Sequence, residues 1–331
     1  MSAPLTLVTC TRNPDPEHFR RVLAGVAALA RPAGRDVEYL VIDSTSEPPV
    51  ASRAEVGAFL ASAPWARVIR APAPGLAAAR SAAIDASAGE LLVWIDDDNV
   101  PAPDYLAQVV RVAGEHPEAS VWGAGTIAVE FTGPVPAWVE RELRPTFQER
   151  AHGRDEFGRA TTWLPYFPVG SGLVTRRAAA LRWARAMREG SYSLTGRTGR
   201  QLTAGDDAQM ILGAVAAGES VGVAAGMRLT HLIPPARCAM PYLQRLEFGL
   251  SGSIRVARAE CFPDDPSPRS IEGLGALAAA RATLSRLRRS GTRAARLELA
   301  RHLGALSGTL QTTNRPEPIW LRAAIAALGL R

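Results

Sequence analysis

The first 125 positions alternate between two hydrophobic patterns, short apolar runs and apolar stripes of helical period. The runs predict strands over residues 5–10, 37–42, 66–70, 91–95 and 120–127, and the stripes predict helices over 17–29, 53–62, 75–86 and 104–114. A chain that alternates strands and helices in this way forms βαβ units around a mostly parallel sheet. We therefore predict an α/β fold in which helices flank a Rossmann-type sheet.

The pattern changes after this region. Residues 130–168 are irregular and rich in proline, glycine and aromatic side chains. This is typical of a substrate-facing insertion, and the aromatics would equally suit a small additional core. Strand-like segments return over 169–175 and 221–230 with a helix over 206–217, and the chain is helical from residue 240. We expect a domain over 1–235, with halves 1–125 and 126–235, and a helical extension over 236–331.

The extension is basic and amphipathic. Residues 236–331 hold 15 arginines against 7 acidic residues, whereas the whole chain has a net charge of +6. Two sets of leucines fall on helical faces, the first being Leu274, Leu277, Leu284 and Leu287, and the second Leu299, Leu303, Leu306 and Leu310. Such helices either pack against the preceding domain or lay a basic face on an anionic membrane surface. The sequence leaves both arrangements open.

Composition excludes several mechanisms. All 38 basic residues are arginine, so Schiff-base chemistry and the lysine-containing P-loop are excluded. Cys10, Cys238 and Cys261 are widely spaced and odd in number, which favours reduced thiols over a disulfide framework or a zinc site. The N-terminus lacks a secretory pattern, and no apolar stretch reaches the roughly 18 residues that span a bilayer. The sequence therefore predicts a cytoplasmic protein.

Three acids, Asp96, Asp97 and Asp98, directly follow the apolar run over 91–95. In open parallel sheets, ligands bind beyond the carboxyl ends of the strands. Adjacent carboxylates repel one another, and a hard cation such as Mg²⁺ or Mn²⁺, shared with substrate phosphates, would hold them together. Capping of the next helix would explain one or two of these acids. All three together predict a metal-bound phosphorylated ligand.

Four separated segments resemble the family-2 glycosyltransferases, which are inverting enzymes of the GT-A fold. They are residues 9–13 after the first strand, Asp43 after the second, the segment 74–99, and the pair Asp206-Asp207. The resemblance covers roughly residues 4–235 and is strongest over 74–104. It implies that residues 1–125 bind a nucleotide-diphosphate sugar and that residues 126–235 bind an acceptor hydroxyl. No nucleic acid is expected as a partner.

The resemblance also implies a role for each matching position. The donor would contact Thr9, Thr11, Arg12, Asn13, Asp43, Arg80, Asp96 and Asp97. Asp98 and Asp96 would hold the divalent cation, Mn²⁺ or Mg²⁺, and His231 matches a strand-end histidine that reaches the metal or diphosphate in some relatives. Asp207 would be the general base, and Asp206 takes the place of the family's glutamate.

Candidates for acceptor contacts come from the surrounding sequence. They are Asp206 beside the expected base, Gly172 in a glycine-rich turn that permits close backbone approach, and Trp163 and Tyr166 in the irregular insertion. The acceptor would be a glycan, a lipid-linked glycan or a small molecule, in polysaccharide, glycolipid or natural-product biosynthesis. Residues 11–13 and 43–46 depart from the family's usual signatures, so the sequence does not predict the donor base.

The expected chemistry accounts for both groups of acids, the one over 96–98 and the one over 206–207. A divalent ion would stabilise charge on the departing diphosphate, and a carboxylate on the opposite side would take the acceptor proton, which inverts the anomeric centre. A nucleotidyltransferase would need a glycine-rich phosphate loop, which residues 9–14 lack, and a phosphatase would need an early aspartate nucleophile. A non-catalytic nucleotide- or carbohydrate-binding scaffold would not need acids at 96, 98 and 207.

Overall fold

The computed structural model describes residues 4–196, 205–272 and 275–331. Within these ranges a single sheet has the strand order β3-β2-β1-β4-β9-β6-β10-β5, with β7 beside β6 and β8 beside β10. The strands are β1 (Leu5–Thr11), β2 (Val37–Asp43), β3 (Ala66–Arg70), β4 (Leu91–Trp94), β5 (Asn99–Pro101), β6 (Ala119–Phe131), β7 (Arg150–Ala151), β8 (Glu156–Gly158), β9 (Val174–Arg176) and β10 (Ser220–Ile233).

The described helices surround this sheet and continue beyond it. The α-helices are α1 (Pro16–Ala27), α2 (Ala54–Ser62), α3 (Leu76–Ala86), α4 (Tyr105–Glu115), α5 (Ala137–Glu142), α6 (Arg177–Arg188), α7 (Asp206–Ala216), α8 (Met240–Cys261), α9 (Ala276–Thr312) and α10 (Ile319–Ala327). Four short 3₁₀ helices are η1 (Val50–Ser52), η2 (Arg144–Phe147), η3 (Pro235–Cys238) and η4 (Ser267–Arg269). The α/β architecture predicted from the sequence is therefore present.

Parallel pairing brings three strand ends to one edge of the sheet. β3, β2, β1 and β4 are parallel neighbours, and Thr11 pairs with Asp43 while Val8 pairs with Trp94. β9 interrupts the parallel order because it pairs antiparallel with both β4 and β6. The carboxyl ends of β1, β2 and β4 thus lie side by side, which is where ligands bind in sheets of this kind.

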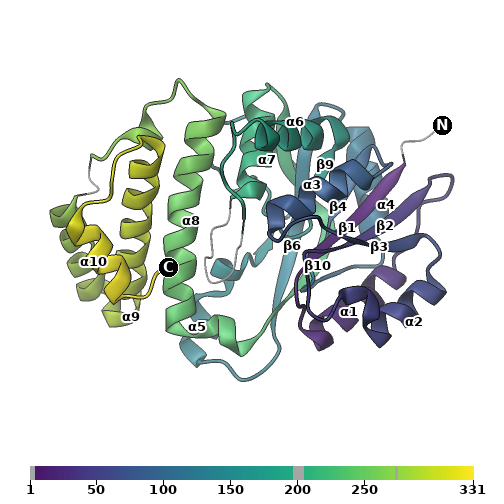
Figure 1. Cartoon of the computed structure of the whole chain (residues 1–331), viewed down its shortest axis with the longest axis horizontal. Helices are drawn as coiled ribbons and strands as arrows, with labels where there is room; N and C mark the ends of the chain where they lie inside the picture. The colour runs from purple at the N-terminus through teal and green to yellow at the C-terminus, as the bar shows by residue number, and fades with distance from the viewer. Residues whose placement is uncertain (1–3, 197–204, 273–274) are drawn as a thin grey trace.

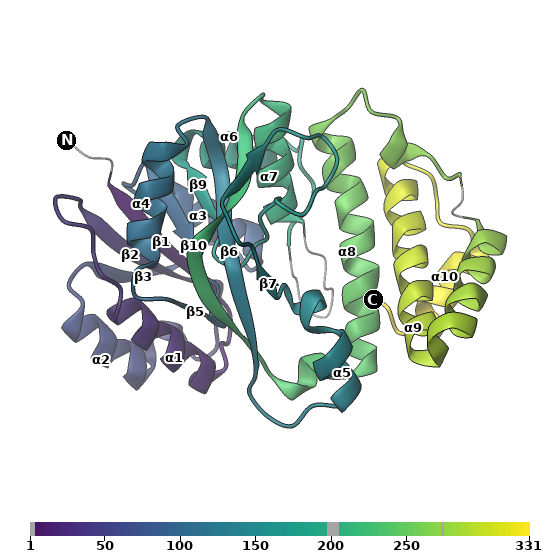
Figure 2. The same ribbon diagram turned by 180° about the vertical axis from the view of Figure 1, so that it is seen from behind.

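Helices cover both faces of the sheet. One apolar cluster joins it to α1, α2 and α4 through side chains such as Phe19, Phe59 and Val109. A second joins the opposite face to α3, α6 and α7 through side chains such as Ile84 and Ile211. Accordingly, α3 lies in front of the sheet in Figure 1 and α4 in front of it in Figure 2.

Three segments differ from the sequence prediction. The strand expected over 169–175 is confined to β9, because the residues before it form a turn in which Gly172 has a φ of +71°. Helix α6 was not predicted, although it is amphipathic, because its buried face consists of alanines and Trp183 rather than of large aliphatic residues. The insertion over 130–168 contains α5, η2, β7 and β8. Its short elements have no clear period, which explains its irregular appearance in the sequence.

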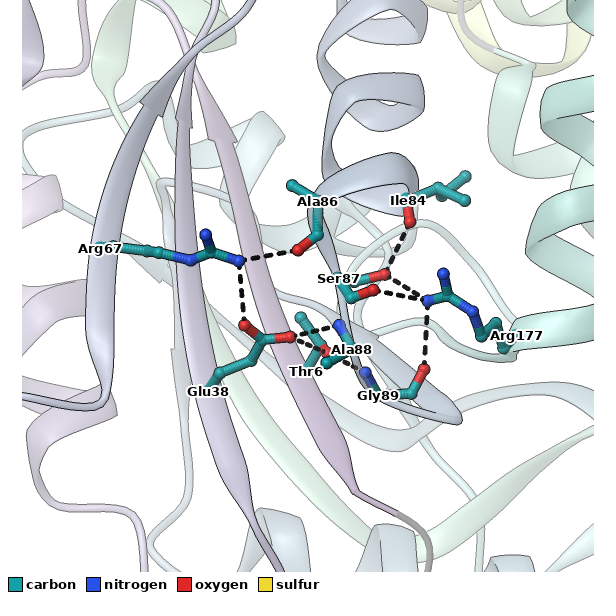
Figure 3. A network of polar contacts seen from close by, with 9 residues as sticks. All are labelled: Thr6, Glu38, Arg67, Ile84, Ala86, Ser87, Ala88, Gly89 and Arg177. Carbon is teal, nitrogen blue, oxygen red and sulfur yellow. Dashed lines mark hydrogen bonds and ion pairs between the residues drawn. The ribbon is translucent and has the colours of Figure 1, made fainter.

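A polar network joins the elements at the opposite end of β1 from the strand ends described above. Glu38 accepts hydrogen bonds from the Thr6 hydroxyl at 2.8 Å and the Ala88 amide at 2.6 Å, and Arg67 lies 3.3 Å away. Arg177 at the start of α6 donates to the Ser87 carbonyl at 2.8 Å (Figure 3). These contacts tie the α3–β4 connection to β1, β2 and α6.

The C-terminal helices form a separate layer. α8 lies between the sheet and the pair α9 and α10 in both views (Figures 1 and 2). The second leucine set faces this layer's interior, where Leu303, Leu306 and Leu310 are buried with Phe248. Among the first set, Leu274 lies outside the described residues. No helix in the described part of the chain is long and apolar enough to cross a membrane.

Candidate active site

The loop that follows β2 is built around Asp43. This carboxylate is buried and accepts hydrogen bonds from the Ser46 amide at 2.7 Å and the Val50 amide at 3.0 Å. Burial acts to raise the pKa of Asp43, but these hydrogen bonds and Arg70, 3.8 Å away, outweigh it and lower the pKa. Both oxygens are thus engaged, and the immediate task of Asp43 is to shape the loop.

We expect Asp43→Ala to destabilise the protein by about 3 kcal/mol, because it leaves buried backbone donors without an acceptor. Urea unfolding would measure this, with the exposed Asp36→Ala as the matched control. Equal unfolding midpoints for the two variants would contradict the structural role.

Residues at the end of β1 separate into buried and exposed positions. The Thr9 hydroxyl donates to the Ile95 carbonyl at 2.7 Å and accepts from Tyr39, so it is used within the sheet. The Thr11 hydroxyl donates to Asp97. Arg12 is exposed, and Asn13, with a φ of +49°, binds the β2 loop through Ser46 and Glu47. Of these residues, Arg12 offers the freest side chain toward a ligand.

Asp98 has a histidine, His231, and an arginine, Arg237, as neighbours. His231, in β10 and paired in register with Asn99, places Nε2 3.6 Å from Asp98 Oδ1. Arg237 in η3 binds Asp98 Oδ2 at 2.6 Å. Burial would raise the pKa of Asp98, but Arg237 and His231 hold it well below its usual range. Asp98 is therefore a carboxylate at neutral pH.

The hydrogen bond on the other side of His231 determines which ring nitrogen can bind a metal. His231 Nδ1 lies 2.9 Å from the Phe147 carbonyl oxygen, which can only accept. Nδ1 therefore donates to this carbonyl, which leaves Nε2, on the side of Asp98, as the ring nitrogen available to a metal. Metal-ligating histidines usually donate their second nitrogen to a carbonyl or carboxylate in this way. Asp98 and His231 together form a donor pair that fits a divalent cation.

Asp96 differs from its two neighbours. Desolvation and the charge of Asp98 raise the pKa of Asp96 to about 7, whereas Arg80 acts in the opposite direction. Protein groups compensate part of the repulsion expected within the triplet: Thr11 binds Asp97, Arg237 binds Asp98, and Arg80 is the nearby cation for Asp96.

The second acidic group lies at the start of α7. Asp206 is buried and bonded to the buried Arg80 on α3, whose guanidinium also lies over the Trp94 ring at 5.7 Å. Burial raises the pKa of Asp206; Arg80 opposes the shift and Asp207 adds to it. Although burial lowers the pKa of Arg80, its interactions with Asp206, Asp207 and Asp96 raise it overall. Arg80 thus brings the two acidic groups, 110 positions apart in sequence, to one place.

Asp207 is less buried than Asp206 and lies against the turn before β9. Its Oδ1 accepts from the Ala208 amide at 2.8 Å, and a Cβ added to Gly170 would come within 2.7 Å of Oδ2. A side chain at position 170 would therefore collide with the expected base. Gly170 leaves this carboxylate room at the edge of the turn.

The expected acceptor residues are in different environments. Gly172 is buried, and its carbonyl accepts a hydrogen bond from Tyr105. The Tyr166 hydroxyl accepts a hydrogen bond from the Ala160 amide at 3.1 Å, so it links two parts of the insertion over 130–168. Trp163 is 39% exposed and its ring lies 5.0 Å from that of Phe167. Trp163 is the member of this set with an aromatic surface open to solvent.

Another acidic cluster lies away from these residues. In the part of the chain that the structure describes, Glu115, His116 and Asp155 are the group of three whose ligand atoms lie within 4.8 Å of one another. Arg111 already binds both Glu115 and Asp155. This cluster is compensated by the protein and differs from the carboxylates at the strand ends.

Arg237 was missed by the sequence analysis. Nothing near position 237 indicates a site, because its partner Asp98 lies 139 residues earlier. The one available signal was its closeness to His231 at the end of the same strand segment.

The parallel sheet, the acids at its carboxyl edge and the aspartate pair at the start of α7 define a glycosyltransferase of the GT-A fold. The family model for glycosyl transferase family 2 matches residues 6–181, and the chain belongs to this family. A curated relative, the succinoglycan biosynthesis protein ExoM of Rhizobium meliloti strain 1021, is 23% identical over 243 residues, covering 72% of this chain and 70% of the relative.

A solved structure has the same fold. The mannosyltransferase PcManGT from Pyrobaculum calidifontis, in complex with GDP-Man and Mn²⁺, aligns with a TM-score of 0.53 and 17% sequence identity. The alignment covers 100% of this chain and 81% of that one. The family assignment identified in the sequence is thus confirmed, and so is the fold class.

Proposed function

We propose that this glycosyltransferase moves a sugar, with inversion, from a nucleotide-diphosphate sugar to an acceptor hydroxyl at the carboxyl edge of its sheet. The observation that carries the proposal is the position of Arg80, which is paired with Asp206 at the start of α7 and lies over the ring of Trp94, two residues before Asp96. Donor activation and acceptor deprotonation need two such groups around one reacting centre. Their shared neighbour supports a single catalytic site.

The metal would be held by Asp98 and His231, with Asp96 nearby. Imidazole nitrogen suits Mn²⁺ better than Mg²⁺, which prefers oxygen ligands, so we propose Mn²⁺ as the preferred ion. When bound, a divalent ion neutralises charge on the diphosphate leaving group as a Lewis acid. The neighbouring Arg237 adds a permanent positive charge to the same region.

Asp207 would take the proton of the acceptor hydroxyl. Its Oδ1 is oriented by the Ala208 amide, and Gly170 leaves space at Oδ2. Asp206 cannot do this task equally well, because it is buried and bonded to Arg80. We propose that Arg80 and Asp206 act as positioning residues that fix the start of α7 and with it the base. Attack from the side opposite the leaving group then inverts the sugar carbon.

The donor and acceptor halves would divide at about residue 125, with residues 236–331 as an extension outside the catalytic domain. Arg12 and Asn13 support donor binding from the end of β1, and the exposed ring of Trp163 supports an acceptor sugar, which stacks well on aromatic faces. The name of the relative ExoM supports a polysaccharide or lipid-linked glycan as acceptor.

A thermal-shift screen of nucleoside diphosphates tests the donor site. We expect one nucleotide to raise the melting temperature by about 5 °C, and only with Mn²⁺, because ligand at 100 times its Kd adds about 2.7 kcal/mol to the native state. Mg²⁺ should give a smaller shift.

The control for this screen is Asp98→Asn, which keeps the side-chain volume and removes the carboxylate. We expect this variant to lose the Mn²⁺-dependent shift. A nucleotide shift of equal size without metal would argue against the proposed ion site, and no shift with any nucleotide would argue against the donor site.

A further inference from the structure

The first part of α9, residues 276–290, is a helix with little contact to the rest of the protein. We call it the outer helix. α9 breaks at Gly291, which has a φ of +80° and a ψ of −178°, and the chain reverses there. Within the outer helix, whose residues are all described, only Ala279 is buried. Figures 1 and 2 show α9 and α10 at the end of the molecule farthest from β2 and β3.

The outer helix exposes three leucines on one face. Leu277, Leu284 and Leu287 are 63%, 47% and 42% exposed, whereas the second leucine set is mostly buried. Spacings of seven and three residues place the three leucines on one face, and Ala279, two residues after Leu277, projects from roughly the opposite side. The side of this helix that carries the leucines, with Arg281 and Arg288 beside them, therefore points away from the protein.

The charge around these leucines has one sign. Between Glu272 and Glu298 the chain contains Arg281, Arg286, Arg288, Arg289, Arg293 and Arg296 and no acidic residue. Among the described residues, neither Arg286 nor Arg293 has a carboxylate partner. Arg293 instead lies over the Trp138 ring of α5 at 5.2 Å. No acidic residue within the outer helix itself balances these cationic groups.

A cavity of about 560 Å³ lies at the Gly291 turn, where the outer helix ends. Arg286, Arg293 and Trp138 line it, and so do Glu142, Glu247 and Arg301. Carboxylates and guanidinium groups therefore share this cavity, and Glu247 is paired with Arg301. The docking surface of the outer helix is thus its exposed leucines and arginines rather than this cavity.

We propose that the outer helix docks this enzyme on the surface of an anionic phospholipid membrane. Leucines would enter the headgroup boundary while the arginines contact lipid phosphates, as amphipathic basic helices do. A second copy of this chain is a poorer occupant, because a two-fold contact would place the arginines against each other. Nucleic acid would use the arginines and leave the leucines exposed. A membrane satisfies both features.

Co-sedimentation of the full chain with vesicles tests this directly. We expect binding to phosphatidylcholine vesicles that contain phosphatidylglycerol, little binding to phosphatidylcholine alone, and weaker binding at high salt. Arg288→Gln/Arg289→Gln should lower the partition coefficient at least about tenfold. The matched control, Arg154→Gln/Arg185→Gln, removes two exposed arginines from the catalytic domain and should change little.

A second variant separates a membrane from a free anion. Leu284→Ser/Leu287→Ser keeps every charge and alters exposed side chains, so it should fold normally and still lose most vesicle binding. Undiminished vesicle binding by this variant, equal loss with the control pair, or equal binding to both vesicle types would overturn the proposal. A dimer in solution that the leucine variant dissociates would do so as well. Vesicle binding is measured without sugar transfer, so its failure leaves the proposed function standing.

Discussion

Asp207→Asn is expected to lower the rate of sugar transfer by about 10²–10⁴-fold, the usual contribution of a general base. The asparagine keeps the side-chain volume, and its amide oxygen can still accept from the Ala208 N–H. What it cannot do is take a proton from the acceptor hydroxyl. The loss should therefore appear in turnover, while the nucleotide-dependent thermal shift stays unchanged.

Asp85→Asn is the matched control for this variant. Asp85 is exposed near the end of α3 and pairs with Arg188, away from the strand ends. Its replacement should leave transfer unchanged. Transfer by Asp207→Asn at the wild-type rate would remove Asp207 from the mechanism, and loss of nucleotide binding would point to a structural role instead.

Arg80→Met is expected to reduce the free energy of unfolding by about 3–5 kcal/mol, because it leaves the buried Asp206 carboxylate without its cation. The methionine keeps most of the apolar contact with Trp94. Urea unfolding at neutral pH measures the effect. Because α7 begins at Asp206, we also expect the rate of sugar transfer to fall as the neighbouring Asp207 loses its position.

Two further variants test the cause of this instability. Arg80→Met/Asp206→Asn removes the buried charge together with its partner and should recover part of the lost stability. Arg20→Met breaks the exposed ion pair with Glu17 and should cost less than about 1 kcal/mol. A similar cost for Arg80→Met and Arg20→Met would contradict the importance of the buried pair.

The parallel part of the sheet could be predicted because β1, β2 and β4 are mostly buried and appear as apolar runs, whereas β3 is a partly exposed edge strand. The run over 91–95 indicated both β4 and the place of the acids after it. Helix α6 was not predicted because its buried face is made mostly of alanines. β5 is three residues long and is defined by pairing with β10, which no local pattern reveals.

The site could be predicted only where its residues carry a local signal. Asp98 and Asp207 each follow a recognisable segment. The contacts of Asp98 with Arg237 and of Asp206 with Arg80 join positions 139 and 126 residues apart and depend on the packing of whole elements. Thr9 was predicted to contact the donor because it lies in a segment that matches the family. Its hydroxyl instead donates to the Ile95 carbonyl within the sheet.

Because Arg237 is paired with Asp98, folding of this region does not depend on the proposed metal ion. The polypeptide brings its own counter-charge to the carboxylate that the proposed ion would use, so Asp98 has a cationic partner before any ion arrives. An incoming ion must compete with a tethered guanidinium that cannot diffuse away. If the proposed ion binds here, the fold would therefore form without it and bind it afterwards, reversibly.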